Sequence, residues 1–378
     1  MFFLPYVPLN SFRMGIPEKI EAIQEELHRT QVNKHTEHHI GLLKAKIAKL
    51  KREEETSRTR GGGSSLSYAV KRSGDATVVL IGFPSVGKST LVNQLTNTKS
   101  KVAAYHFTTL KVVPGMMEYK GARIQILDMP GILKGASTGK GLGKRVLSVV
   151  RSADLVLFLV EVHQPNALSI LKEELRNIGI RPDEPQPNLN IEKTGSGGIS
   201  VTTLVKMTKM KVETVTKVLQ EFDVHNARVR INEDISYDQL IDVLLQNRKY
   251  LPTLTAMNKI DLVSPERLSE IKSEVNYDFL PISADTNLNI EQLRELIYDK
   301  LNFIRVFMRP RGEETDYVQP MIVKNNSSVR DVCDKIHREM KYTLRYAQVS
   351  GKSVKFNGQR VGVTHRLMNE DIITLVTK

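Results

Sequence analysis

The nine residues GFPSVGKST, from Gly82 to Thr90, directly follow the apolar run TVVLI, which ends at Ile81. Two glycines spaced by four residues, then a lysine and a hydroxyl, form the phosphate-loop pattern when a strand precedes them and a helix follows. The glycines let successive backbone N–H groups point at phosphate oxygens, and the helix N-terminus adds positive potential. A simple tight turn would explain neither the lysine nor the hydroxyl. The stretch therefore predicts a strand, a phosphate-binding loop and a helix.

Within this loop, we expect Lys88 to reach the β and γ phosphates and Ser89 to ligate Mg²⁺. The residues expected to surround the nucleotide phosphates are Gly82, Phe83, Pro84, Ser85, Val86, Gly87, Lys88, Ser89 and Thr90.

The stretch DMPG, Asp128 to Gly131, comes directly after a second apolar run, RIQIL. At the end of a strand a carboxylate can hold the Mg²⁺ shell, and a following glycine can respond to the γ phosphate. Four residues alone are a weak signal, but after a phosphate loop they are a strong one. We expect Asp128 to act on the metal through a water molecule.

Threonines lie between these two motifs, in the stretch YHFTTL, which includes Phe107, Thr108 and Thr109. A threonine here can complete the Mg²⁺ shell only while the γ phosphate is present, so the segment would be ordered by GTP and released on hydrolysis. Ordinary strand propensity is the competing explanation, and either threonine could serve. We favour Thr109.

Two further motifs follow later apolar runs: NKID, from Asn258 to Asp261, and SAD, which begins at Ser283. A carboxylate at Asp261 can accept two N–H bonds from a guanine edge, which adenine cannot offer, so GTP is favoured over the alternative of an ATPase of related fold. Ala284 is the expected backbone donor to the guanine O6. Either motif alone would be an ordinary loop; in this order they indicate a nucleotide site.

Short apolar runs alternate with helical patterns along the middle of the chain, which predicts an α/β fold with a mostly parallel, buried sheet. More than 90 residues separate LVLFLV (155–160) from LTAM (254–257), far more than one crossover needs. We expect an inserted α+β subdomain at 178–250, packed against the domain that hosts it. After residue 305, MIV, a helix from SVRDVCDKIHREM, SVKF and DIITLV predict a compact module of strands and a helix.

The N-terminal region contains two helical patterns separated by a polar break, which predicts a helical hairpin. The stretch TRGGGSSLS then has the composition of a linker. The expected organisation is a disordered leader at 1–13, a hairpin at 14–60, a linker at 61–74, a GTPase domain at 75–177 and 251–304, the insert at 178–250, and a final domain at 305–378. The cluster of His35, His38 and His39 is expected to be surface at a helix flank rather than a metal site, because no further ligands adjoin it.

The chain has a formal net charge of +13, which is concentrated in two blocks. Lys71 to Arg151 holds 13 basic and three acidic residues, and Arg305 to Lys378 holds 14 and eight. Such surfaces suit RNA, although ordinary solvated lysines are the simpler alternative. No apolar stretch reaches the roughly 20 residues needed to cross a bilayer, so no membrane partner is expected. The single cysteine, Cys333, suits a reducing compartment.

In their order, GFPSVGKST, FTTL, DMPGILKGASTGKGLG and NKID resemble the motifs of the Obg-like GTPases, specifically the developmentally regulated GTP-binding (DRG) family. The resemblance covers about Met14 to Lys378. It implies a helical hairpin, a GTPase domain interrupted by an insert like domain 2 of ribosomal protein S5, and a C-terminal TGS domain of β-grasp form. It also implies a cytoplasmic, ribosome-associated GTPase connected with translation, with a stabilising protein partner in eukaryotic members.

By position, the resemblance implies phosphate contacts from Gly82 to Thr90, magnesium ligands at Ser89 and Thr109, and guanine contacts at Asn258, Lys259 and Asp261. The residues that we expect to take part in hydrolysis are Lys88, Thr109 and Gly131.

Ile132 stands where Ras-like enzymes place a water-orienting glutamine, so we expect slow intrinsic hydrolysis, on the order of 10⁻⁴ per second. Some relatives hold a catalytic potassium ion with an asparagine at the position of Ser85, which makes K⁺ a further candidate beside GTP, GDP and Mg²⁺. The basic stretch Lys134 to Arg151 either contacts ribosomal RNA or is a solvated loop, and the sequence favours neither. We expect a GTPase switch associated with ribosomes, without DNA specificity; the alternative is a nucleotide-stabilised RNA-binding adaptor with negligible turnover.

Overall fold

The computed structural model describes residues 15–31, 33, 36–60, 73–96, 105–107, 110–129, 142–337 and 339–377. These residues form two compact units. One unit combines the two N-terminal helices with residues 185–248, and the other holds the rest of the described chain. The expected leader and most of the expected linker lie outside the described residues.

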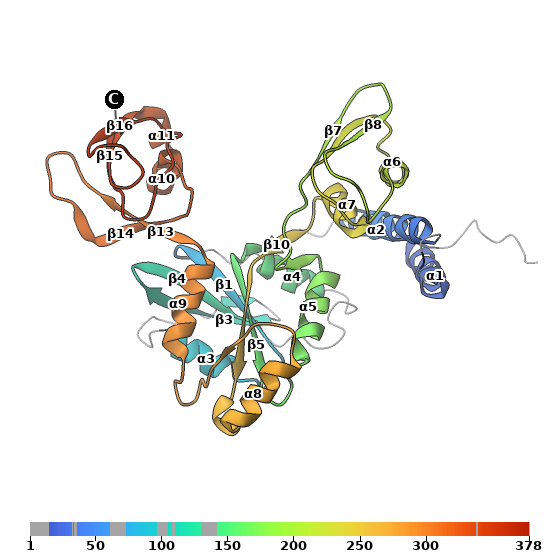
Figure 1. Ribbon diagram of the computed structural model, residues 1–378, viewed down its shortest axis with the longest axis horizontal. Coiled ribbons are helices and arrows are strands. Elements are labelled where there is room, and N and C mark those ends of the chain that lie inside the picture. Colours follow the sequence, from blue (N-terminus) through green and yellow to red (C-terminus); the bar gives the residue numbers. More distant parts are fainter. Residues whose placement is uncertain are drawn as a thin grey trace, which may run out of the picture. The chain divides into compact units, whose positions relative to one another are not determined.

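The larger unit is built on a seven-stranded sheet in the order β12-β11-β5-β1-β4-β3-β2 (Figure 1). Its strands are β1 (Ala76–Ile81), β2 (Tyr105–Phe107), β3 (Leu110–Tyr119), β4 (Ala122–Asp128), β5 (Leu155–Glu161), β11 (Thr253–Asn258) and β12 (Leu280–Pro281). The five strands from β12 to β4 are parallel, whereas β3 and β2 are antiparallel additions at one edge. The α/β fold with a mostly parallel sheet is therefore confirmed, and β2 and β3 are strands that the apolar runs did not reveal.

Helices cover both faces of this sheet, which explains why β1 and most of β5 are continuous apolar runs (Figure 1). One buried cluster joins the sheet to α3 (Lys88–Leu95) and α9 (Ile290–Lys300). The other joins it to α4 (Leu142–Ser152), α5 (Ala167–Asn177) and α8 (Pro265–Glu274). The sheet is thus a rigid scaffold whose strand ends alone are available for chemistry.

A short parallel pair, β6 (Ile180–Pro182) and β10 (Lys249–Leu251), marks the points where the chain leaves this domain and returns to it. Everything between these two strands is an insertion, as the long gap between apolar runs predicts.

The C-terminal domain has a five-stranded sheet in the order β14-β13-β17-β15-β16. Its elements are β13 (Phe303–Met308), β14 (Asp316–Lys324), α10 (Val329–Ile336), α11 (Met340–Thr343), β15 (Leu344–Ser350), β16 (Gln359–Val361) and β17 (Ile372–Thr377). The expected strand at SVKF is wrong. Residues 353–356 lie in the turn that joins β15 to β16, whose glycines at 351 and 358 have positive φ angles.

This domain contacts the base of the larger sheet. Ile322 of β14 belongs to the buried cluster that lines α3 and α9. Lys335 lies 2.5 Å from Asp75, just before β1, and Lys324 lies 3.1 Å from Asp154, just before β5. These ion pairs are at the amino ends of the parallel strands, opposite the edge where the motif residues gather.

The smaller unit consists of α1 (Ile16–Arg29) and α2 (Glu37–Arg60) together with the insert. The insert contains β7 (Leu189–Lys193), β8 (Ile199–Thr203), α6 (Val212–Glu221), β9 (Ala227–Ile231) and α7 (Tyr237–Leu245). We expected the insert to pack on its host domain, but its core is shared with α2, which contributes the fully buried Ala45. Lys44 and Lys49 of α2 pair with Asp238 and Asp223 of the insert.

Candidate nucleotide site

Five motif-bearing segments meet at the carboxyl edge of the parallel sheet. The phosphate loop follows β1, Asp128 ends β4, Glu161 ends β5, Asn258 ends β11 and Ser283 follows β12. Because these strands run parallel, their last residues come to one edge, which is where α/β sheets bind ligands. The fold alone therefore brings together residues that are up to 200 positions apart.

The phosphate loop can be built only with glycine at its two ends. Gly87 has φ +91, in the left-handed region, and a Cβ there would lie 2.4 Å from the Asn258 Nδ2. At Gly82 a Cβ would lie 2.5 Å from the carbonyl oxygen of Leu159 on β5. Both glycines are thus required by close packing of the loop against neighbouring strands.

Lys88 begins α3 and lies folded over the loop. Its Nζ donates to the carbonyl oxygens of Gly82 at 3.1 Å and Phe83 at 2.8 Å. Only 9% of the residue is exposed, and this burial lowers the pKa of the ammonium, with Asp128 acting in the opposite direction. Backbone carbonyl groups therefore hold the charge at the loop.

Ser89 and Asp128 form the next layer of the site. The Ser89 hydroxyl donates to Asp128 Oδ2 at 3.0 Å, while Asp128 Oδ1 is buried and has no hydrogen-bond partner among the described residues. Burial raises the pKa of Asp128, and the Ser89 hydrogen bond and Lys88 oppose the rise. A buried carboxylate oxygen without a partner is costly unless a cation or water completes it. Oxygen ligands of this kind fit Mg²⁺, which takes few protein ligands and keeps several waters.

Asn258 connects the phosphate side of the site to the opposite side. Its side chain is 2% exposed, and Nδ2 donates to the carbonyl oxygen of Val86 at 2.8 Å. Its Oδ1 accepts from the backbone N–H of Ala284 at 2.9 Å. One buried amide thus ties the phosphate loop to the segment that begins at Ser283.

Lys259 has a partner that the sequence motifs did not reveal. Its Nζ lies 2.7 Å from Glu161 Oε2, and both side chains are largely buried. Lys259 also has φ +66, which is unusual for a side chain of this kind and directs the chain into the short 3₁₀ turn η1 (Ile260–Leu262). Glu161 is opposite Asn258 in the β5–β11 register. The sequence offered one signal for this partner, a glutamate at the end of the otherwise apolar strand β5.

The remaining motif residues differ in how much the structure says of them. Asp261 is exposed in η1, and Ser283 is fully buried, its hydroxyl accepting from the backbone N–H of Thr286 at 3.2 Å. Phe107 ends β2. Thr108, Thr109, Gly131 and Ile132 lie outside the described residues, as do residues 134–141 of the basic stretch, whereas its residues 142–151 lie in α4.

Two other sequence expectations concern the rest of the surface. Within the described ranges, no helix is long and apolar enough to cross a bilayer, and no group of three or more His, Cys, Asp or Glu could hold a metal. In the histidine cluster, His38 Nδ1 lies 2.7 Å from Thr214 Oγ1, and His39 pairs with Glu26. Both side chains therefore have structural partners, while His35 lies outside the described residues.

Three protein-family models together match nearly the whole chain from residue 77 onward. Residues 77–193 match the family described as 50S ribosome-binding GTPase, 196–303 match the C-terminal region of the MMR_HSR1 domain, and 304–377 match the TGS domain. The first match contains the phosphate loop, the second contains Asn258 and Ser283, and the third is the C-terminal five-stranded domain.

Curated relatives align with the chain over nearly their full length. A GTP-binding protein of Methanocaldococcus jannaschii is 50% identical over 97% of this chain and 94% of its own. Developmentally-regulated GTP-binding protein 2 of Homo sapiens is 41% identical over 97% and 100%. Ribosome-interacting GTPase 1 of Saccharomyces cerevisiae is 41% identical over 96% and 99%. The chain therefore belongs to the DRG family of Obg-like GTPases and is a GTP-binding protein of the ribosome-binding GTPase class.

Proposed function

We propose that the chain hydrolyses GTP to GDP and phosphate in a Mg²⁺-dependent reaction, and that its nucleotide state controls its engagement with the ribosome. The observation that carries this proposal is the arrangement around Asp128. A buried carboxylate oxygen without a partner, a serine hydroxyl and a lysine ammonium converge beside a loop of backbone N–H groups. An ammonium group for phosphate, together with a hydroxyl and a carboxylate for a metal, suits a magnesium–triphosphate group better than an uncharged ligand.

On the phosphate side, residues 82–90 would surround the phosphates with backbone N–H groups and the Lys88 ammonium. Ser89 would ligate the metal directly and Asp128 through water. When bound, Mg²⁺ would neutralise charge on the β and γ phosphates. We assign hydrolysis and switching to Lys88, Thr108, Thr109 and Gly131. Of these, Lys88 lies within the described residues and the other three lie outside them.

On the base side, we assign guanine selectivity to Asp261 and to the Ala284 N–H, which would exchange its bond to Asn258 Oδ1 for one to the guanine O6. Asn258 and Lys259 would hold the surrounding loops. Asp261 is exposed and therefore available to a base. In contrast, both the Nδ2 and the Oδ1 of Asn258 are hydrogen-bonded to backbone groups of the protein. An adenine in the same place would leave the carboxylate without a donor pair, which is why GTP is preferred.

Hydrolysis without assistance should be slow, on the order of 10⁻⁴ per second, because Ile132 cannot orient water. K⁺ or a macromolecular partner would then raise the rate. The proposed partners are the ribosome or its RNA and a stabilising protein, the proposed location is the cytoplasm, and the proposed domain limits are those expected from the sequence. A relative that carries the name ribosome-interacting GTPase 1 and the strongly basic composition support these assignments.

The decisive experiment measures GTP binding and turnover by the full chain, with and without Mg²⁺, K⁺ and ribosomes. Lys88→Ala should lose most nucleotide affinity, and Lys272→Ala, which removes an exposed lysine of α8, should not. Binding that is selective for GTP, with turnover that ribosomes or K⁺ increase, is the expected result. Tighter binding of ATP would overturn the assignment of the base site. Turnover that stays at background under every condition would leave a GTP-stabilised RNA-binding adaptor instead.

A further inference from the structure

The sheet of the C-terminal TGS domain has one face packed and one face largely uncovered by its own domain. The buried core residues Val306, Val349 and Ile373 pack on α10. The side chains between them in the strands point to the other side of the sheet. On that side the β14 end is occupied, because Ile322 and Phe303 pack into the cluster that contains α9. The opposite end, formed by β17, β15 and β16, carries no such apolar covering.

A row of polar side chains crosses this end, from the exposed Arg360 through the half-buried Gln348 to Thr374, which is 9% exposed. Arg360, Gln348 and Thr374 are direct neighbours on three adjacent strands, because Gln348 is paired in register with Arg360 on one side and Thr374 on the other. Strand spacing of about 4.8 Å makes the row about 10 Å long. Tyr346 lies two residues from Gln348 on the same face, with the Arg360 guanidinium 4.7 Å from the centre of its ring.

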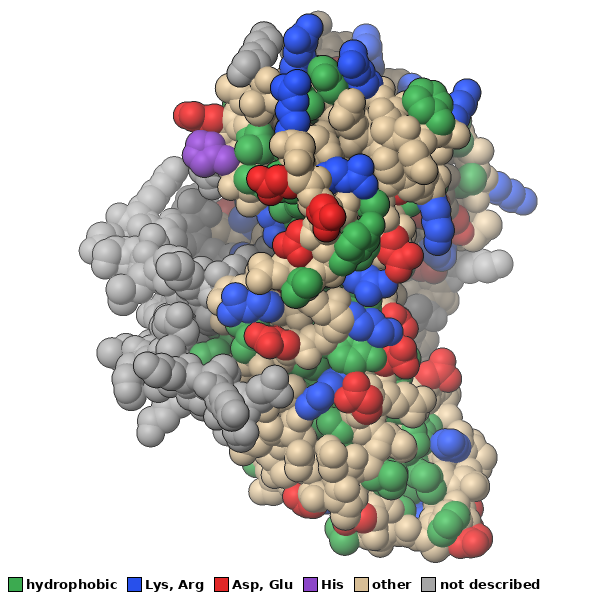
Figure 2. Space-filling view, turned by 90° about the vertical axis from the view of Figure 1, so that its left-hand side faces the viewer, with side chains coloured by type: hydrophobic (Ala, Val, Ile, Leu, Met, Phe, Trp, Pro, Cys, Tyr) green, Lys and Arg blue, Asp and Glu red, His purple; other side chains and the backbone are tan. Residues whose placement is uncertain are grey.

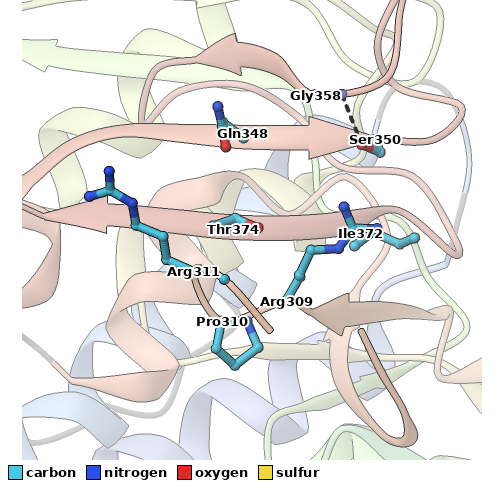
Figure 3. Close-up of a pocket in the computed structure, with 9 residues that line it drawn as sticks. Arg309, Pro310, Arg311, Gln348, Ser350, Gly358, Ile372 and Thr374 are labelled. Carbon is cyan, nitrogen blue, oxygen red and sulfur yellow. Dashed lines mark hydrogen bonds between the residues drawn. The ribbon is translucent and has the colours of Figure 1, made fainter. Parts of the chain in front are cut away.

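A shallow pocket of about 130 Å³ adjoins this row. Figure 3 shows Arg309 and Arg311 extending from the segment after β13 across β17, on either side of Thr374, with Gln348 on the next strand. Arg309 donates to the Thr315 hydroxyl, so its charge is not neutralised by that bond. We call the set of side chains on this end the basic sheet face: Arg309, Arg311, Tyr346, Gln348, Arg360 and Thr374.

The charge of this face is uncompensated. Within the described part of the chain, Arg309, Arg311 and Arg360 have no carboxylate partner, whereas the nearby Arg305 is paired with Glu370. Glu313 and Glu314, in the loop towards β14, do not line the pocket. Figure 2 shows Lys and Arg side chains gathered over the upper part of the view. The face therefore attracts anions.

We infer that the basic sheet face binds single-stranded RNA, with phosphates on the arginines and an unpaired base stacked on the Tyr346 ring, which the Arg360 guanidinium would leave to reach a phosphate. This inference deepens the ribosomal-RNA contact of the proposed function by giving it a place and a strand state. An aromatic ring and a side-chain amide on one face of a sheet, flanked by cations, can stack bases and hydrogen-bond their edges. Duplex RNA keeps its base faces inside the helix and cannot use the ring. An acidic peptide would pair with the arginines but would leave the Tyr346 ring without a stacking partner.

The test uses fluorescence anisotropy of the full-length chain with a labelled ten-nucleotide single-stranded RNA of mixed sequence, with and without GDP, over a series of salt concentrations. Arg311→Gln/Arg360→Gln should weaken binding about tenfold and reduce the slope of log affinity against log salt by about 1.4, as loss of two phosphate contacts predicts. The matched control, Arg330→Gln/Lys341→Gln, removes two charges from the helical side of the same domain. It should change the affinity by no more than about twofold and the salt slope by no more than about 0.7, half the change expected for the test variant.

Tyr346 separates stacking from charge. Tyr346→Leu should weaken binding about tenfold without changing the salt slope, whereas Tyr346→Phe should bind as the unaltered chain does. Circular-dichroism melting of each variant shows whether the domain remains folded, and the phenylalanine variant keeps the test valid if the leucine variant unfolds. Ultraviolet crosslinking should then place the RNA on a peptide that contains residue 346.

Binding of single strands by both sets of variants within twofold of the unaltered chain would overturn this site while leaving RNA binding elsewhere intact. Equal affinity for a duplex of the same length, or equal competition by polyglutamate, would overturn the choice of single-stranded RNA. Absence of any RNA binding by the unaltered chain would remove both this site and the proposed RNA contact. GTP affinity measured on the same samples reports on the nucleotide site independently.

Discussion

The side-chain amide of Asn258 donates to the backbone carbonyl of Val86 across 2.8 Å, although 172 residues separate the two. The same amide accepts from Ala284 N–H, so removing it leaves two backbone groups unpaired in a buried place. Leaving such groups unsatisfied costs about 1–3 kcal/mol each.

Asn258→Ala should therefore weaken both GTP and GDP binding by tenfold or more, because the phosphate loop loses its support. Isothermal titration measures the effect. Asn177→Ala, at the exposed end of α5, is the control and should bind both nucleotides normally. Equal affinities in the two variants would show that the amide does not organise the site.

Asp128→Asn should affect the stability of the nucleotide-free chain and its stabilisation by Mg²⁺ with GTP in opposite directions. Burial raises the pKa of Asp128, so its ionised form is disfavoured in the folded chain relative to the unfolded chain. Ionised Asp128 then reduces stability above its folded-state pKa, and the penalty disappears as pH falls through that value towards the ordinary carboxyl range of about 4.

At pH 7 the nucleotide-free asparagine variant should melt at or above the temperature of the unaltered chain, and the gap should close as the pH is lowered. It should also lose the additional stabilisation that Mg²⁺ gives in the presence of GTP. Thermal melting across pH 5–8, with GTP alone and with Mg²⁺ added, measures both effects. A variant that keeps the full Mg²⁺ effect would remove Asp128 from the metal site.

Asp261→Asn should exchange guanine for xanthine selectivity. The amide offers a donor where the carboxylate offers only acceptors, and xanthine has a carbonyl where guanine has an amino group. We expect GTP affinity to fall at least about a hundredfold and xanthosine triphosphate to bind better than GTP. Competition titrations with a fluorescent nucleotide give both constants, and retained GTP preference would contradict the assigned base contact.

Gly41→Ala tests the packing of α2 on the insert. In an isolated helix this substitution stabilises by about 1 kcal/mol. Here an added Cβ would lie 2.4 Å from the ring of Tyr237, so we expect a net loss of about 1–3 kcal/mol. Denaturant unfolding should show the loss in the chain with Tyr237 present and a smaller loss in a Tyr237→Leu background. A stabilised Gly41→Ala variant would show that α2 and α7 do not meet in solution.

Sequence patterns identify features that depend on a few neighbouring residues. The phosphate loop, the apolar strands and the strand-end motifs are of this kind, because a buried parallel strand must be apolar throughout and the loop needs glycine at two fixed places. The strand β3 escaped detection because it includes Pro114 and Gly115, which weaken the strand pattern. They are tolerated because β2 pairs with β3 only at residues 110–112, so within the described chain positions 114 and 115 have a neighbouring strand on one side only.

Features that depend on pairing between distant segments were not predictable in the same way. The Glu161–Lys259 ion pair exists because β5 and β11 are neighbours in a particular register, which no local pattern specifies. Ala45 of α2 is a small residue that would suit almost any helix contact, so nothing in it designates the insert as its partner. The turn at 353–356 has strand-like residues but follows a glycine with φ +143, which ends β15.

The shared core of α2 and the insert has a consequence for synthesis. The hairpin leaves the ribosome before the insert, and the helices that cover its apolar side begin only at Val212, about 150 residues after α2 ends. At about 5–20 residues per second, α2 waits on the order of ten seconds or longer for its partner, while the first strands of the GTP-binding domain are being made. During that interval the nascent chain presents an amphipathic surface that a chaperone or the ribosome itself would have to shelter.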